Sequence, residues 1–269
     1  MARPLELPLR FRFGILLEPL RRVKGKRMST ETASPDLRVW DLPIRLFHWT
    51  LVILLVLLWV SGQFGVLSLV VDQEILGIKV NVFMGNMDLH MLLGQAVLAL
   101  VLFRLMWGFV GSSTARFSSF VRGPRPVMEY VRSILRGDMP MTTGHNPAGA
   151  LIILVMLGLL LFQGSLGLFG NDDIFSQGPL AAKVSKATSD RLTVVHGQVF
   201  YILLAVVAVH IAAALYYLVR GKNLIRPMIT GRKAADGVHA DAPRLVSPWR
   251  AIPVLAVAVG VVWAVVTQV

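Results

Sequence analysis

Cysteine is absent from the chain of 269 residues. Its absence excludes disulfides, iron–sulfur clusters, thiolate metal sites and the covalent attachment of a c-type haem within this chain. Any bound cofactor must therefore be held by nitrogen or oxygen ligands.

Charged residues are also scarce, at 16% of the chain, whereas 55% of the residues are hydrophobic and the mean hydropathy is +0.66. Soluble domains carry about 25% charged residues. Apolar runs of about twenty residues are long enough to cross a bilayer as helices. Five such runs occur, at 44–62, 89–111, 148–170, 192–219 and 251–267. We therefore predict an all-α integral membrane protein with five transmembrane helices.

Acidic residues are outnumbered, with 15 Asp or Glu against 27 Lys or Arg and a net charge of +12. The basic residues gather in alternate connections, at 1–45, 112–147 and 220–250, while 63–88 is acidic and 171–191 is balanced. This distribution follows the positive-inside rule, which explains the charge better than a nucleic-acid partner does. We expect a multi-pass protein of a bacterial inner membrane, with a cytoplasmic N-terminus and a periplasmic C-terminus.

Four histidines lie within the predicted spans. His196 and His210 are fourteen residues apart on the fourth helix, so they share one face, about 21 Å apart along the axis. In the expected topology His210 and His48 lie toward the cytoplasm, and His196 and His90 lie toward the outer face. Ionisable side chains inside a membrane usually face the bundle interior and have a partner there. We expect His48 to pair with His210 and His90 to pair with His196.

Two imidazoles from different helices at one depth meet the requirement of a low-spin b-type haem, whose iron takes one nitrogen from each side. We predict two non-covalent haems b, ligated by His48 with His210 and by His90 with His196. Zinc is the competing metal, but about 21 Å prevents His196 and His210 from sharing one ion, and two histidines alone leave zinc short of ligands. For each histidine taken singly, a packing role is the alternative.

Two further residues are candidates for cofactor or substrate contacts. Arg104 follows His90 by fourteen residues, so it either neutralises a haem propionate near the cytoplasmic layer or extends to the membrane interface. His145 precedes the third helix and either caps that helix or lines a quinone site. Four glycines in the spans could leave room for a flat cofactor: Gly62, Gly94, Gly164 and Gly197.

The chain also carries an ordered series of motifs over about 38–233. They are "VWDLPIRLFHW" at 39–49, "LHMLLG" at 89–94, "FRLMWGFVGS" at 103–112, "GHNPAGA" at 144–150, "VHGQ" at 195–198 and "LVRGKNLIRPMITGRK" at 218–233. Together they resemble the bacterial cytochrome b561 family, which includes the di-haem b-type subunits of nickel–iron hydrogenases. The resemblance implies that the haem ligands are His48, His90, His196 and His210, which agrees with the pairing by depth.

We expect four regions along the chain: a basic cytoplasmic extension at 1–38, a four-helix di-haem domain at 39–233, a linker at 234–250 and an additional transmembrane helix at 251–269. The last helix carries Ala256, Gly260 and Ala264 at four-residue intervals. Such spacing allows close helix association in membranes. We expect this helix, separate from the four-helix core, to dock a partner subunit or a second copy of the chain.

The expected function is electron transfer through two b-type haems between a periplasmic redox partner, such as a c-type cytochrome or a hydrogenase, and the quinone pool of a respiratory chain. The chain would then be an electron-transfer subunit of an oxidoreductase, with quinone oxidoreductase activity left open. One alternative is a stand-alone haem oxidoreductase, such as a superoxide or ferric reductase. Another is a non-redox transporter or assembly protein that uses histidines as a proton relay.

Overall fold

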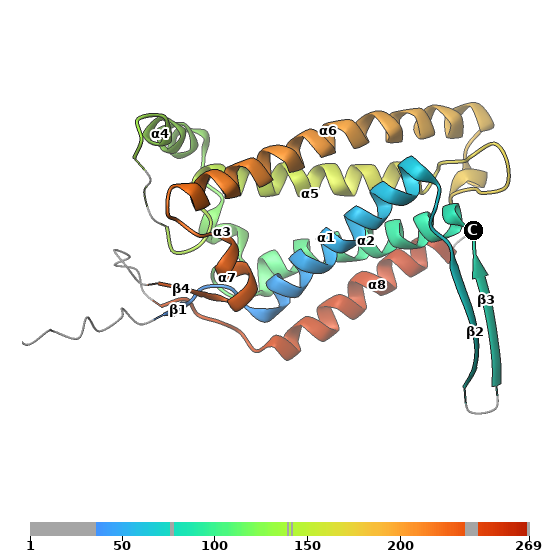
Figure 1. Ribbon diagram of the computed structural model, residues 1–269, viewed down its shortest axis with the longest axis horizontal. Coiled ribbons are helices and arrows are strands. Elements are labelled where there is room, and N and C mark those ends of the chain that lie inside the picture. The colour runs from blue at the N-terminus through green and yellow to red at the C-terminus, as the bar shows by residue number, and fades with distance from the viewer. Residues whose placement is uncertain (1–35, 76–77, 139, 141, 235–241, 268–269) are drawn as a thin grey trace, which may run out of the picture. The chain divides into compact units, whose positions relative to one another are not determined.

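A computed structural model describes residues 36–75, 78–138, 140, 142–234 and 242–267 (Figure 1). The N-terminal extension predicted for 1–38 therefore lies almost wholly outside the described residues. The described part contains five helices long and apolar enough to cross a membrane, which confirms the predicted fold class. They are α1 (Leu42–Phe64), α2 (Asn86–Val110), α5 (Pro147–Gly167), α6 (Lys186–Val219) and α8 (Ala251–Thr267).

Shorter elements connect the five spans. The helical ones are α3 (Phe117–Phe120), α4 (Pro124–Leu135), α7 (Ile225–Thr230) and the 3-10 turns η1 (Ala181–Lys183) and η2 (Pro248–Arg250). The strands are β1 (Leu37–Arg38), β2 (Leu69–Ile75), β3 (Ile78–Met84) and β4 (Arg232–Lys233). β1 pairs antiparallel with β4, which joins the start of the bundle to the segment after α7.

Short polar side chains begin three of the membrane helices. Asp41 accepts a hydrogen bond from the Ile44 amide at 2.9 Å, and Asn146 accepts one from the Gly149 amide at 2.7 Å. The Ser185 hydroxyl accepts from an amide in the first turn of α6 in the same way. These caps satisfy amides that have no partner within the helix, which fixes where each helix begins.

The connection between α1 and α2 is a hairpin of β2 and β3, paired antiparallel from Leu69 opposite Met84 to Ile75 opposite Ile78. α1 ends at Gly65, whose φ of 64° lies in the left-handed region that favours glycine. The hairpin begins four residues later and returns the chain to the start of α2 (Figure 1). We call this side of the bundle the hairpin end. The apolar runs of the sequence do not predict this hairpin.

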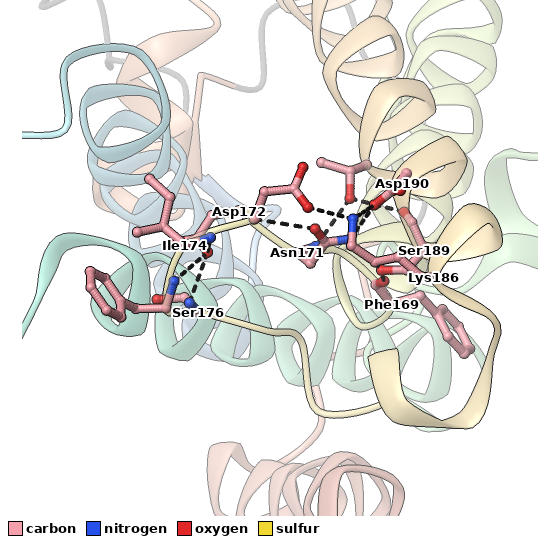
Figure 2. Close-up of polar contacts among 11 residues, drawn as sticks. Phe169, Asn171, Asp172, Ile174, Ser176, Lys186, Ser189 and Asp190 are labelled. Carbon is pink, nitrogen blue, oxygen red and sulfur yellow. Dashed lines mark hydrogen bonds and ion pairs between the residues drawn. The ribbon is translucent and has the colours of Figure 1, made fainter.

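α6 begins at Lys186, six residues before the start that its apolar run predicts. Its polar first turns are held by the preceding loop, as Figure 2 shows. The Asn171 side-chain amide donates to the Ser189 hydroxyl at 2.6 Å and to the Asp190 carboxylate at 2.9 Å, and the Ser189 hydroxyl donates to the Phe169 carbonyl at 2.7 Å. These bonds join the end of α5 to the start of α6, so hydropathy alone places the helix start too late.

The tip of the same loop is organised by Asp172, whose carboxylate accepts hydrogen bonds from three successive backbone amides (Figure 2). The amides belong to Ile174, Phe175 and Ser176, at 3.0, 3.0 and 2.8 Å. Because these bonds stabilise the ionised carboxylate, they lower the pKa of Asp172, the Ile174 amide most of all.

α2 is the central helix, because it packs against α1, α5 and α8. One core cluster is formed by Ile44, Phe103, Trp107, Ala115 and Ala258, which come from α1, α2, the segment after it and α8. A second cluster is formed by Val97, Val101, Leu157, Leu160 and Leu203, which come from α2, α5 and α6. α6 packs along α5, on the side of the bundle away from α8 in Figure 1.

The fifth membrane helix is packed on the bundle through α2 and is not separate from it. Ala258 is fully buried against α2, and Val262 packs in a third core cluster with Leu98 and Ala99 of α2. Ala256 and Gly260 of the small-residue series are exposed on the helix surface. One face of α8 thus completes the core, and docking of a partner by the other face stays a prediction.

α4 lies in the connection between α2 and α5, where no helix was predicted. Its Tyr130 is buried, and the Tyr130 hydroxyl is hydrogen-bonded to the Tyr217 hydroxyl of α6 at 2.6 Å. Burial, and then this hydrogen bond, raise the pKa of Tyr130 above its ordinary value. Twelve-residue amphipathic helices are too short for a membrane-span search, which explains the omission.

We predict that Asp41→Ala destabilises the protein by about 2–4 kcal/mol, because it removes both the cap of α1 and the acceptor of the buried Trp107 indole N–H at 3.1 Å. The thermal unfolding midpoint of the detergent-solubilised protein is the measurement. Asp36→Ala is the matched control, since the ion pair of Asp36 with Arg226 at 3.4 Å is partly exposed and contributes at most about 1 kcal/mol. Equal midpoints for the two variants would contradict the prediction.

Candidate functional site

Four histidines form two ring pairs, each joining α6 to another helix. The imidazole centroids of His48 on α1 and His210 on α6 are 6.5 Å apart, with an angle of 55° between the ring planes. Those of His90 on α2 and His196 on α6 are 6.3 Å apart, at 75°. The structure therefore brings together the two pairs that the depth argument expects. We call them the 48/210 pair and the 90/196 pair; the second lies at the hairpin end.

Both separations match two imidazoles on opposite sides of one metal ion. A bond from a metal to an imidazole nitrogen is about 2 Å long, and the nitrogen lies about 1 Å from the ring centroid, so the two centroids are expected about 6 Å apart. Among the described residues no group of three or more His, Asp or Glu is placed to hold a metal ion. Within the described part of the chain, the histidine pairs thus have a spacing that fits two ligands of one metal ion, without the further protein ligands of a tetrahedral zinc site.

His90 is held by the Ser61 hydroxyl of α1, at 2.7 Å from its Nδ1. The Ser61 hydroxyl donates its own hydrogen to the Leu58 carbonyl at 3.0 Å, so toward His90 it acts as the acceptor. The Nδ1 of His90 therefore carries the proton. Its Nε2 keeps a free lone pair, as a metal ligand requires.

His196 is fixed in the same tautomer by the protein backbone. Its Nδ1 lies 3.0 Å from the carbonyl oxygen of Gln163 on α5, and a carbonyl can only accept. Both rings of the 90/196 pair therefore donate through Nδ1 and leave Nε2 unprotonated. Neither Ser61 nor Gln163 was predicted to contact a histidine, because a serine and a backbone carbonyl within an apolar helix give no distinguishing signal.

Each ring of this pair also packs directly against the backbone of a glycine. A Cβ at Gly62 would lie 3.3 Å from Cε1 of His90, and one at Gly167 would lie 3.2 Å from Cε1 of His196. Both distances are tighter than ordinary van der Waals contact. The rings thus fill the space that the missing side chains leave, so these glycines orient the histidines.

The other glycines of interest differ in their surroundings. A Cβ at Gly164 would lie only 2.5 Å from Leu98, so Gly164 serves the close packing of α5 on α2 and leaves no room for a cofactor. A Cβ at Gly94 or Gly197 would meet no heavy atom within 4 Å. These two positions are the ones that retain open space beside the backbone.

The 48/210 pair has different surroundings. The Nδ1 of His48 is buried and has no hydrogen-bond partner among the described residues. Its ring meets Trp49 edge-on at 5.0 Å between centroids, and the Trp49 indole N–H donates to the Met228 carbonyl of α7 at 3.1 Å. Aromatic packing, rather than a protein acceptor, surrounds this imidazole.

Arg104 is buried within the bundle, with only 3% of its surface exposed. Its guanidinium carbon lies 5.0 Å from the Phe117 ring centre and 5.9 Å from that of Phe120, which is cation–π distance. Asp41 is the acid whose charge acts on it most strongly, and Nη1 is buried with no hydrogen-bond partner in the described part of the chain. A buried cation with an unused N–H fits an anionic group such as a carboxylate.

His145 is packed between two aromatic rings, those of Trp40 and Phe120, each with its centroid 4.5 Å away. Burial, and then the positive charge of Arg104, lower the pKa of His145 to about 3, so the imidazole is neutral at physiological pH. The capping role offered as one alternative for His145 belongs to Asn146, whose side chain caps α5. The Nδ1 of His145 is buried, and no described residue forms a hydrogen bond with it.

Comparison with known proteins gives one family match. The family described as prokaryotic cytochrome b561 matches residues 39–231, a range that contains both histidine pairs, Arg104 and His145. No curated protein and no solved structure matches the chain.

We predict that Gly167→Ala displaces the His196 ring by a few tenths of an ångström and weakens cofactor retention at the 90/196 pair about tenfold. Haem content and the visible absorption spectrum of the purified protein are the measurements. Gly158→Ala on the same helix is the control, because its Cβ would meet no heavy atom within 4 Å. A Gly167→Ala protein that keeps the full spectrum would show that ring seating has no role.

Proposed function

The chain belongs to the prokaryotic cytochrome b561 family, and on this premise we propose that it is an electron-transfer subunit with two b-type haems that connects a periplasmic redox partner to the quinone pool. The five apolar helices and the family establish a multi-pass membrane protein, and the family implies electron transfer by b-type haem. The observation that carries the finer proposal is the presence of two facing imidazole pairs at metal-bridging separation.

In this proposal the 48/210 pair would hold one haem and the 90/196 pair would hold the other. When bound, haem supplies one-electron redox chemistry, and the protein supplies position and environment. His196 and His210 belong to different sites, because fourteen residues of a continuous helix separate them by about 21 Å. The unused N–H of Arg104 would neutralise a propionate.

Bis-histidine ligation favours electron transfer over reduction of a small molecule at the metal. Two imidazoles per iron leave no open coordination position for oxygen or superoxide. The protein therefore has to hold its ligands rigidly, and the hydrogen bonds to His90 and His196 serve this purpose.

We place the quinone site at His145, at the end of the bundle away from the hairpin. Support comes from the neutral imidazole with an unused ring nitrogen and from the flat aromatic walls of Trp40 and Phe120. The bias of basic residues supports a cytoplasmic location for this end. The redox partner, a c-type cytochrome or a hydrogenase-like enzyme, would then bind at the hairpin end, and the exposed face of α8 would contact a partner subunit or a second copy.

We predict a ratio of two haems b per chain by pyridine haemochrome assay against protein concentration. Replacing His48 or His210 with Ala should remove one and the same component of the reduced-minus-oxidised spectrum. Replacing His90 or His196 should remove the other component. A ratio near one, or loss of one component by both His48→Ala and His90→Ala, would overturn the paired assignment.

We predict that His145→Phe raises KM for a quinol about tenfold, because one hydrogen bond to the quinone head is lost, while both haem spectra are unchanged. Since the pKa of His145 is about 3, the rate should show no titration of this residue between pH 5 and pH 8. His145→Gln, which keeps a hydrogen-bonding side chain, is the control. An unchanged KM in the His145→Phe protein would place the quinone elsewhere.

A further inference from the structure

We propose that Ser61 is a positioning residue that holds His90 and lowers the reduction potential of the haem at the 90/196 pair. The inference rests on the proposed di-haem function. It concerns a side chain of α1 that contributes no ligand and acts only through the ring of His90 on α2.

The direction of the Ser61 hydrogen bond follows from the atoms present. The Ser61 hydroxyl donates its hydrogen to the Leu58 carbonyl. It therefore accepts a hydrogen bond from the Nδ1–H of His90, with the oxygen and nitrogen 2.7 Å apart. An acceptor at Nδ1 draws the ring toward imidazolate character and makes Nε2 a stronger donor. A stronger donor stabilises the oxidised iron more than the reduced iron, which lowers the potential.

Ser61 is itself fixed in place, as a positioning residue must be. Ser61 is 1% exposed, and its backbone carbonyl accepts from the Asn86 side-chain amide at 3.0 Å and from the Gly65 amide at 3.2 Å. The side-chain oxygen of Asn86 in turn accepts from the Leu67 backbone amide at 3.1 Å. These bonds join the end of α1 to the start of α2, so the hydroxyl and the ring of His90 are held at one junction.

The two histidine pairs differ in the hydrogen-bond acceptors available to their Nδ1 atoms. In the 90/196 pair both Nδ1 atoms have protein acceptors, one from the Ser61 side chain and one from the Gln163 backbone. In the 48/210 pair the Nδ1 of His48 has none among the described residues. Ser61 is therefore the acceptor that a substitution can remove, and the 48/210 haem is an internal reference within the same molecule.

The test is a redox titration of the purified two-haem protein carrying Ser61→Ala. We expect one midpoint potential to become more positive by about 59 mV and the other to stay unchanged. For a one-electron couple this shift is a tenfold change in the reduction equilibrium. The electron paramagnetic resonance g-values of that low-spin haem should shift as well. In a His48→Ala background, which keeps only the 90/196 haem, the shift should persist.

Two variants serve as controls. Ser61→Thr keeps the hydroxyl and should restore the wild-type midpoint. Ser165→Ala removes a similar hydroxyl of α5, which donates to the Leu161 carbonyl at 2.8 Å, and should change neither midpoint.

If Ser61→Ala loses the haem, Ser61→Cys provides the measurement, since a thiol is a weaker acceptor of similar size and should shift the midpoint in the same direction. Wild-type midpoints in a Ser61→Ala or Ser61→Cys protein that binds two haems would overturn the inference and leave the proposed function standing. A wild-type protein with fewer than two haems would instead overturn the proposed function.

Discussion

A membrane interior offers no water to a polar side chain, so an imidazole within it needs a partner there, on another helix or on a bound group. This constraint explains how α6 is held. α6 packs along α5, and its two histidines extend the connection to α1 and α2 through the ring pairs at 6.5 and 6.3 Å. The positions of His196 and His210 relative to each other are set by one continuous helix from Lys186 to Val219.

The lengths of the apolar runs were sufficient to predict five spans, and the helix period together with the alternation of loop charge predicted the pairing of the histidines. Both signals depend on residue types that are rare in apolar helices, so a histidine or a lysine is informative wherever it occurs. The acceptors of the histidines could not be predicted in this way. Ser61 resembles any small residue in a span, and the acceptor for His196 is a backbone carbonyl that every residue possesses. Position in three dimensions alone distinguishes them.

The connections were the least predictable part of the fold. The β2–β3 hairpin and α4 are short, and their stability comes from pairing and from contacts such as Tyr130 with Tyr217 rather than from a long apolar run. The start of α6 was placed too late for a related reason. Its first turns are polar and are held by Asn171 and by the end of α5, which a hydropathy criterion does not detect.

The buried polar groups at the two ends of the bundle differ in their hydrogen-bond partners. At the hairpin end, the Ser61 hydroxyl accepts from His90 and the Gln163 backbone carbonyl accepts from His196, so each of these rings has one tautomer and one orientation. The Gln163 side-chain oxygen is buried there without a hydrogen-bond partner among the described residues. At the opposite end a buried guanidinium, Arg104, lies beside aromatic rings and Asp41 with an N–H unused, and His145 has an unused ring nitrogen. An unpaired polar group inside a protein costs about 1–3 kcal/mol, more when it is charged, unless a bound molecule pairs with it. In the proposed function, the hairpin end holds the 90/196 histidines in fixed orientations for one haem, while at the opposite end the unused nitrogens of Arg104 and His145 would pair with a haem propionate and a quinone.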